Sequence, residues 1–507
     1  MNQSQVESTV ITADRLPIAP RSRVTEDGVE YALAQTDGAP QLVVRAADAA
    51  RLDGFEGDLT QHEGQHVLVG PCNAGNADAL RARLPWLRPQ PLGLATSAGM
   101  GDRLGLATPG HVRAVRAVGG GIAPIFPQQS IREMQRTGRS AQQVMDEAIW
   151  GLFAEGWREP FGADADHLKT PADIDTCLAA GFTFFTIDPG QYVDDRAETA
   201  DPAALREAFA ALPWAELDDS PEQALRRYAD LSLEIEGHTI ALDEPAALRA
   251  AVKYGRAVAH VAGMYRHLQQ ASPDRPTELE VSVDETEHVT THAEHVYIAS
   301  ELQRLGVRWV SLAPRYVGRF EKGVDYIGDL DAFEADFAVH AAIARHYGPY
   351  KLSLHSGSDK FSVYPIAMRL TRGLVHLKTA GTSYLEALRT IAALDSALFR
   401  EIYQFARDRY ETDRASYHVS AELDRAPLPD DLSDADLPSL LTQFDAREIL
   451  HVTFGSVLTD RTADGTLRFY DRLMTLLRTH PDAYAEYLEA HFVRHLQPFA
   501  VKEREQA

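Results

Sequence analysis

The chain has 507 residues, with 74 Asp and Glu against 50 Lys and Arg, so its formal charge is −24 with neutral histidines. This acidic balance disfavours nucleic acids and anionic membranes as partners. A hydrophobic content of 45% with 24% charged residues is ordinary for a globular protein and excludes disorder over the whole chain.

The first 90 residues predict a small N-terminal α/β lobe. Short apolar runs at 31–34, 42–44 and 67–69 are typical of strands, and a helical pattern follows at 76–84. The lobe contains Cys72, one of only two cysteines in the chain. So few cysteines fit a reducing compartment, and no secretory signal or apolar run of about 18 residues is visible. We therefore expect a cytoplasmic protein with no membrane-spanning segment.

Eight short apolar runs follow, and each ends abruptly in polar or glycine residues. They lie at 92–96, 122–126, 161–165, 182–187, 279–283, 307–313, 351–354 and 374–377. Helical patterns separate most of them, with clear examples at 141–153, 171–180, 292–305 and 333–347. Strands that alternate with helices and carry polar residues at their C-terminal ends predict an α/β fold with a (β/α)8 TIM-like barrel.

The predicted barrel spans residues 91–390. Its main insertion, at about 192–270, falls between the fourth and fifth strands and holds a strand-like stretch interrupted by Gly237 and a long helix. Residues 391–507 have mostly helical patterns around a proline- and aspartate-rich loop at 426–438, so we expect a helical C-terminal extension.

Two carboxylates and a histidine end the third predicted strand, at Asp164, Asp166 and His167. A neutral imidazole is a common ligand of divalent metals, and an adjacent carboxylate can act as a general base. The alternative is structural, because Asp164 or Asp166 could cap the helix that follows.

Two more histidines belong to the last two predicted strands. His355 directly follows one strand, and His376 lies in the next. Inward-facing residues of barrel strands meet above the core, so His167, His355 and His376 could bind one ion. Zinc, nickel and manganese all suit three such ligands, and the alternative is a set of hydrogen-bonded core histidines.

The fifth predicted strand places a carboxylate inside the barrel. Alternation puts Glu280 on the face opposite the apolar residues Leu279 and Val281, where a carboxylate is costly unless it is paired or binds a metal. Glu280 is therefore a candidate second acid/base or metal ligand, and a buried ion pair is the alternative. No Rossmann fingerprint or Walker A motif is present, so we expect no bound nucleotide.

These motifs resemble the tagaturonate/fructuronate epimerase family, metal-dependent enzymes of bacterial hexuronate catabolism. The resemblance covers about residues 90–460, whereas the first 90 residues match poorly. The matching segments are 101–105 (GDRLG), 128–130 (QQS), 136–139 (RTGR), 161–167 (FGADADH), 184–189 (FFTIDP), 280–287 (EVSVDETE), 354–365 (LHSGSDKFSVYP), 378–386 (KTAGTSYLE) and 451–453 (HVT).

The resemblance implies a role for each of the main site residues. It implies Asp166 as proton acceptor, Glu280 as proton donor, and a divalent metal on His167, His355 and His376. The implied reaction inverts C4 of a hexuronate, counted from the hydroxymethyl end. Two routes could achieve this, transient oxidation at C4 by a nicotinamide or retro-aldol cleavage and re-addition, and a predicted metal site without a dinucleotide fingerprint favours the second. The alternatives are a 4-epimerase of neutral ketohexoses such as tagatose and fructose, a class II aldolase, and a non-catalytic sugar-binding protein.

A sugar-acid substrate would also restrict the charge of the site. Its carboxylate meets the repulsive field of a chain with charge −24, so the pocket has to be locally cationic. The candidate substrate-binding residues near strand ends are Asp102, Arg103, Gln129, Asp188, Arg315, Lys360 and Lys378. Among these, Lys378, Lys360, Arg315 and Arg103 are the candidate cations. We expect the sugar acid as the only ligand besides the metal, and a homo-oligomer is possible.

Overall fold

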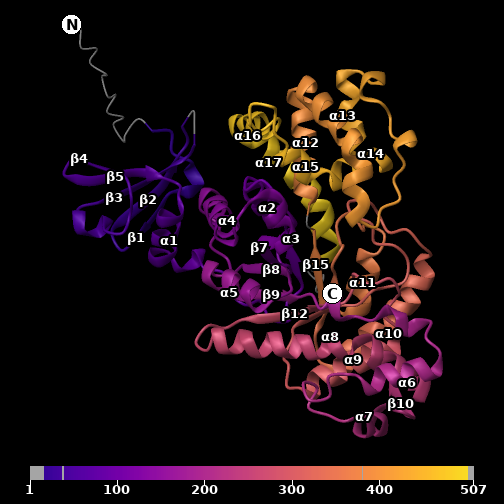
Figure 1. Ribbon diagram of the computed structural model, residues 1–507. Coiled ribbons are helices and arrows are strands. Elements are labelled where there is room, and N and C mark those ends of the chain that lie inside the picture. The colour runs from indigo at the N-terminus through magenta and orange to yellow at the C-terminus, as the bar shows by residue number, and fades with distance from the viewer. Residues whose placement is uncertain (1–15, 37–38, 380, 501–507) are drawn as a thin grey trace, which may run out of the picture.

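The computed structural model describes residues 16–36, 39–379 and 381–500. Its centre is a closed barrel of eight parallel strands in chain order, which confirms the predicted fold class (Figure 1). The strands are β6 (Ser97–Gly99), β7 (Ala123–Ser130), β8 (Gly162–Leu168), β9 (Phe184–Ile187), β12 (Glu278–Ser282), β13 (Ser311–Ala313), β14 (Lys351–Leu354) and β15 (Val375–Lys378). Pairing of β15 with β6 closes the barrel.

Helices alternate with these strands and surround them. They are α2 (Thr108–Val118), α3 (Ile131–Thr137), α4 (Ala141–Glu155), α5 (Pro171–Ala180), α8 (Glu244–Ala271), α9 (His292–Arg304), α10 (Leu330–Tyr347), α11 (Tyr364–Thr371) and α12 (Thr382–Leu394). Capping boxes begin α4, α5 and α9, so their free backbone amides are satisfied by side chains. The apolar faces of helices and strands merge into one continuous core.

The first barrel strand differs from its prediction at 92–96. Gly93 and Leu94 instead form a turn, in which Gly93 has a φ of +60°, and the backbone amides of Leu92 and Gly93 donate to the buried carboxylate of Glu278. The strand itself begins at Ser97, and it is built from small residues because Gly99 lies directly against the Gln128 side chain. A Cβ at Gly99 would lie 3.0 Å from Gln128 Cγ.

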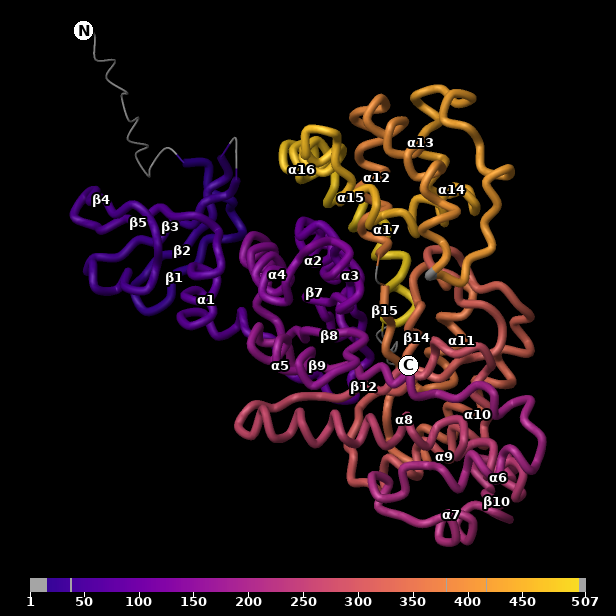
Figure 2. Tube along the Cα trace, viewed as in Figure 1, coloured from indigo at the N-terminus to yellow at the C-terminus, as the bar shows by residue number. Residues whose placement is uncertain are grey.

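The N-terminal lobe is an antiparallel sheet, whose strands run in the order β1, β2, β3, β5 and β4. Its elements are β1 (Val24–Glu26), β2 (Val29–Ala34), β3 (Gln41–Ala46), β4 (Asp58–His62), β5 (Gln65–Pro71) and helix α1 (Ala74–Arg83). The lobe lies at one side of the barrel, where α1 and β2 contact α4 (Figure 2). It is therefore remote from the strand ends that carry the predicted site.

The insertion between β9 and β12 covers the opposite flank of the barrel. It holds α6 (Pro202–Ala210), α7 (Pro221–Tyr228) and the hairpin of β10 (Leu231–Ile235) and β11 (His238–Leu242) before α8. Gly237 lies at the hairpin turn with a φ of +86°, which explains the interruption in the predicted strand-like stretch.

The remaining helices follow the barrel. They are α13 (Ser396–Asp413), α14 (Phe444–Val452), α15 (Phe454–Thr459), α16 (Tyr470–Thr479) and α17 (Pro481–Leu496). Helix α17 packs on α2 and α12, and its His495 accepts a hydrogen bond from the backbone amide of Asp359, just after β14. These helices thus reach back to the C-terminal ends of the barrel strands. Within the described ranges, no helix has both the length and the apolar character needed to cross a membrane.

Candidate active site

Strand β8 brings two adjacent side chains into the barrel mouth. In a regular strand Asp166 and His167 would point to opposite faces. The pairing of β8 with β9 shifts register between Ala165 and Leu168, and His167 has a φ of +55°, which is uncommon for a non-glycine residue. This bulge lets Asp166 and His167 both line one cavity, and both lie within the strand and not after it.

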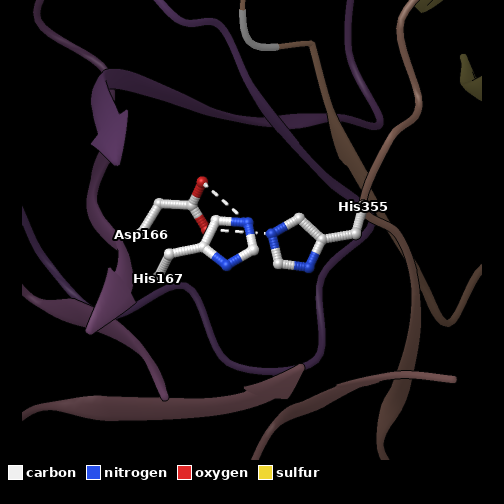
Figure 3. A group of neighbouring side chains, drawn as sticks. All are labelled: Asp166, His167 and His355. Atoms are coloured by element: carbon white, nitrogen blue, oxygen red, sulfur yellow. Dashed lines mark hydrogen bonds and ion pairs between the residues drawn. The ribbon is translucent and has the colours of Figure 1, made fainter. Parts of the chain in front are cut away.

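Asp166, His167 and His355 form a compact, buried group of possible metal ligands (Figure 3). Asp166 Oδ1 is 2.9 Å from His355 Nε2, and Asp166 Oδ2 is 4.0 Å from His167 Nε2. The two imidazoles stack with ring centroids 4.6 Å apart. Their ligand atoms all lie within 4.8 Å of one another, so one ion could contact all three side chains.

Further carboxylates hold the far nitrogen of each imidazole. His167 Nδ1 lies 3.2 Å from Asp188 Oδ2, and His355 Nδ1 lies 3.3 Å from Asp284 Oδ1. Burial opposes the ionisation of Asp188, but the hydrogen bond and charge of His167, with help from the Gly190 amide and Lys169, lower the pKa of Asp188 to about 2. Carboxylate–histidine pairs of this kind orient metal-binding histidines and leave the other nitrogen for the ion. In both residues that nitrogen is Nε2, which faces Asp166.

Lys378 lies below this group at the centre of a ring of carboxylates. Its Nζ is 2.7 Å from Asp166 Oδ1, 2.7 Å from Glu280 Oε1 and 3.0 Å from Asp164 Oδ2, and it also donates to Thr186 Oγ1 at 2.7 Å. The Lys378 side chain has no solvent exposure. Burial favours the neutral amine, but the three carboxylates outweigh burial and raise the pKa of Lys378 above its ordinary value. Lys378 is therefore an ammonium shared among carboxylates.

The same arrangement sets the protonation of the carboxylates. Burial opposes their ionisation, yet the charge of Lys378 together with the nearby histidines holds the pKa of Asp166 well below its usual range and that of Glu280 at about 2. Burial dominates at Asp164, and together with the charges of Asp166 and Glu280 it raises the pKa of Asp164 to about 7. Asp166 and Glu280 are thus both ionised, and Asp166 is the one that lines the cavity.

A small cavity lies at the barrel mouth. Its lining residues are Arg103, Ser130, Arg132, Glu133, Asp166, His167, Lys322, His355 and Tyr417. Tyr417 comes from the segment after α13, and its hydroxyl accepts a hydrogen bond from Arg136. Residues on both sides of the barrel and from the C-terminal extension therefore meet around Asp166. Glu280 does not line the cavity, because Lys378 bonds it from the side of Asp166.

The structure does not place His376 with the other two predicted metal ligands. His376 points into the barrel two residues before Lys378, one layer deeper, and its Nδ1 lies 2.9 Å from Ser97 Oγ. Burial lowers the pKa of His376 to about 3. In the described part of the chain, no group of three possible ligand atoms within 4.8 Å includes His376.

Several predicted substrate-binding residues are occupied by other contacts. Asp102 accepts three backbone hydrogen bonds from the loop after β6, at 2.7–2.9 Å. Gln129 donates to Glu133 at 3.1 Å, below the cavity wall. Lys360 donates to three carbonyl oxygens and does not line the cavity, and neither does Arg315, whose backbone amide donates to Thr290. Lys378 is sequestered by carboxylates, so of the four predicted cations Arg103 alone lines the cavity.

Lys322, Arg132 and Tyr417 line the cavity but were not predicted. Lys322 lies in the long segment between β13 and α10, nine residues beyond the end of the predicted strand. Arg132 is at the start of α3, two residues after the Gln128–Ser130 motif. The placement of Arg132 after a strand end could have indicated its position, whereas Lys322 and Tyr417 have no local sequence signal.

Comparisons with known proteins give the family. A sequence model of tagaturonate epimerase matches residues 21–499. The tagaturonate/fructuronate epimerase of Thermotoga maritima is 44% identical over 478 residues, which cover 93% of this chain and 94% of the relative. Crystal structures of fructuronate-tagaturonate epimerase from Cohnella laeviribosi are 37% identical and cover 97% of this chain and 98% of theirs. Their TM-scores are 0.91 for the native form and 0.90 for a glycerol complex.

The similarity includes most of the N-terminal lobe. The expected poor match of the first 90 residues is wrong, because the family match begins at residue 21 and the relatives cover nearly the whole chain. The lobe is thus part of the family's fold and not an appendage of this chain. The barrel, the residue motifs and these similarities agree, and the chain belongs to the tagaturonate epimerase family, whose members are isomerases.

Proposed function

We propose that this enzyme interconverts D-tagaturonate and D-fructuronate with the help of a bound divalent metal ion. The single observation that carries the proposal is the pair His167 and His355, each held at Nδ1 by a carboxylate and each presenting Nε2 beside Asp166. Family membership supports the substrate, since the Thermotoga relative is named for both sugar acids. The two unpaired cysteines, Cys72 and Cys177, support a cytoplasmic location.

The donor set fits a transition metal. Two imidazoles suit zinc, nickel or manganese, and the cavity beside them leaves further coordination positions to substrate oxygens. His167 and His355 would hold the ion through Nε2, with Asp166 beside it as the base, whereas His376 would remain a core residue. A bound divalent ion would act as a Lewis acid on the substrate ketone and its neighbouring hydroxyl.

The chemistry of the substrate favours retro-aldol cleavage. The two sugar acids differ only at C4, counted from the hydroxymethyl end, and the C4 hydrogen is β to the C2 ketone. Simple enolisation therefore cannot remove this hydrogen. Cleavage of the C3–C4 bond, rotation of the aldehyde fragment and re-addition would invert C4 and leave its hydrogen in place.

Asp166 is the group that would accept the C4 hydroxyl proton. It lines the cavity, it is ionised, and its pKa lies well below the usual range. Re-addition on the opposite face would need a proton for the new hydroxyl, and the resemblance assigned this role to Glu280. Because Glu280 does not line the cavity, we assign it an indirect role, in which Glu280 and Lys378 together fix the charge and position of Asp166. On re-addition Asp166 would return the proton to the new C4 alkoxide.

The direct test is conversion of tagaturonate by the full-length protein. The protein is stripped with a chelator, reloaded with Zn²⁺, Ni²⁺ or Mn²⁺, and incubated with tagaturonate before chromatography. Fructuronate should form only with metal, and the reaction should run in both directions. A free three-carbon aldehyde as the main product would indicate an aldolase, and faster conversion of tagatose than of tagaturonate would indicate an epimerase of neutral ketoses.

The retro-aldol route has its own test. Deuterium placed on C4 of tagaturonate should remain on C4 in fructuronate, because that C–H bond is never broken. Loss of the label to solvent would contradict the route. Asp166→Asn should lose much more of kcat than of bound metal, and a loss of metal alone would refute its role as proton acceptor.

A further inference from the structure

Three cations line the cavity, and they differ in what they contact. Arg103 Nε lies 2.8 Å from Glu133 Oε1, and Arg132 Nη2 lies 2.9 Å from Glu285 Oε1. Lys322 Nζ instead donates to the hydroxyl of Ser356 at 2.8 Å. Among residues 16–36, 39–379 and 381–500, no carboxylate forms an ion pair with Lys322. Its ammonium group therefore has no carboxylate in direct contact, although Glu133 and Glu285 lie close enough to interact with its charge.

The backbone around Lys322 is firmly anchored. Lys360 donates to the carbonyl oxygens of Glu321, at 2.6 Å, and of Val324. Arg447, from α14, donates to the carbonyl oxygen of Gly323 at 2.5 Å. The peptide groups on both sides of Lys322 are thus fixed, while the ammonium group itself is held by one hydroxyl. Lys322 therefore has a fixed backbone, whereas its long side chain leaves the ammonium group free to move.

Lys322 also lies close to the reacting groups. Ser356, its hydrogen-bond partner, directly follows His355, and both Lys322 and Asp166 line the cavity. In the substrate, two carbon–carbon bonds separate C4 from the carboxylate carbon. A residue that binds the carboxylate must therefore line the same cavity as Asp166, which Lys322 does.

We propose that Lys322 binds the carboxylate of the sugar acid and retains the carboxylate-bearing fragment while the C3–C4 bond is broken. This inference rests on the function proposed above. It assigns to Lys322 the discrimination between a uronate and a neutral ketose, a role that the sequence had suggested for Lys378, Lys360, Arg315 or Arg103.

The products of the cleavage step explain why a residue that holds the substrate carboxylate is needed. The electron pair of the C3–C4 bond stays on C3 and gives an enediolate of carbons 1–3. The C4 hydroxyl loses its proton to Asp166 and becomes an aldehyde, so carbons 4–6 form a separate aldehyde that carries the carboxylate. This fragment has to turn to present its other face before the bond re-forms. The carboxylate is the only charged group of this fragment, so a contact to it can hold the fragment while the aldehyde group turns.

A lysine suits a pivot better than an arginine does. The ammonium group is a compact charge with three rotatable donors on a flexible stem, whereas a guanidinium binds carboxylates in a fixed, two-pronged geometry. Lys322 can therefore keep its contact while the carboxylate turns. Arg103 is unsuited to this task, because it is paired with Glu133 and stacks on the Phe454 ring at 3.5 Å.

The test compares Lys322→Met with Arg132→Met in the metal-loaded, full-length enzyme. The readouts are kcat/KM for tagaturonate, the fraction of turnovers that release free aldehyde, and the inhibition constants of D-glycerate and glycerol. Glycerate carries the carboxylate of the fragment, and glycerol is its uncharged analogue. Loss of one charge-assisted hydrogen bond predicts about a 10- to 100-fold weaker binding of glycerate to Lys322→Met. Glycerol inhibition should not change, and the released aldehyde should increase.

Arg132→Met serves as the matched control because Arg132 lines the same cavity and bears the same charge. This variant should keep the wild-type ratio of glycerate to glycerol inhibition constants, and Lys322→Arg should recover glycerate binding but not the full kcat. Unchanged glycerate inhibition in Lys322→Met would overturn the inference, as would a specific loss of glycerate binding in Arg132→Met. Failure of the wild type to convert tagaturonate would instead overturn the proposed function, while the glycerate measurement would still report on Lys322.

Discussion

Replacement of Lys378 by Met would test whether one ammonium group controls the protons of the site. Lys378 contacts two carboxylates at 2.7 Å and a third at 3.0 Å. At an effective dielectric constant of about 20, each contact corresponds to roughly 6 kcal/mol of gross Coulomb attraction. Desolvation of the buried charges cancels most of this energy, and loss of one partner of a buried ion pair typically costs about 3–5 kcal/mol.

In Lys378→Met, protonation of the neighbouring carboxylates should relieve the cost of leaving their negative charges buried without a partner. Without the ammonium group, Asp166 and Glu280 cannot both remain ionised beside Asp164 within one buried cluster, so their pKa values must rise. Asp166 would then be protonated near neutral pH and could no longer accept the hydroxyl proton. We expect kcat for tagaturonate to fall at least about 100-fold, the lower range for loss of general acid–base catalysis. The remaining activity should increase with pH as Asp166 ionises.

Lys253 offers a matched control for the loss of stability. It is equally buried, and its Nζ lies 2.6 Å from Glu198, 3.2 Å from Glu294 and 3.9 Å from Asp195, away from the cavity. Lys253→Met should lower the melting temperature to a similar extent but retain most of the wild-type kcat. Thermal unfolding and initial rates between about pH 6 and 10 would separate the two effects. A Lys378→Met enzyme with wild-type kcat and an unchanged pH profile would refute the proton-control role.

Three further predictions concern the metal and pH. Added Zn²⁺ or Mn²⁺ should raise the melting temperature of the chelated protein, since an ion at 100 times its Kd stabilises the folded state by about 2.7 kcal/mol. His355→Gln should lower the bound metal measured by elemental analysis, whereas His376→Gln should retain it, and the opposite result would restore His376 as a ligand. Burial and the neighbouring Glu321 raise the pKa of Glu448 to about 8, so its stabilising contribution is complete below pH 4.5 and is lost as the pH rises through 8. Glu448→Gln should therefore show a smaller fall in melting temperature between about pH 6 and 9 than the wild type.

Most barrel strands could be predicted because their buried residues are short apolar runs that can be recognised in the sequence itself. Strand β14 has the predicted bounds, and β9 lies within its prediction at 182–187, since each contains apolar residues and ends directly before a polar one. Strand β6 could not be found this way. Its residues are small because neighbouring side chains crowd it, and the more apolar stretch before it is a turn held by Glu278. That turn depends on a residue 186 positions away in the chain.

The candidate site was partly predictable for a similar reason. The rule that functional groups lie at C-terminal strand ends correctly brings Asp166, His167 and His355 together. The rule does not give the depth of a side chain along the barrel axis. It therefore does not show that His376 lies deeper in the barrel than Asp166, His167 and His355. The position of Lys322 depends on contacts from Lys360 and Arg447, which belong to distant parts of the chain. No pattern near Lys322 indicates these contacts.

The charge of the chain has a consequence at the site that composition alone could not show. A pocket for a sugar acid was expected to reverse the acidic character of the chain with several cations. In the structure Arg103 and Arg132 are neutralised by carboxylates, and Lys378 is shared among three of them. The attraction for a substrate carboxylate then depends on Lys322 and on the proposed divalent ion. Because each adds a local charge within a Debye length of the substrate, a higher salt concentration should weaken glycerate inhibition of the wild type more than that of Lys322→Met.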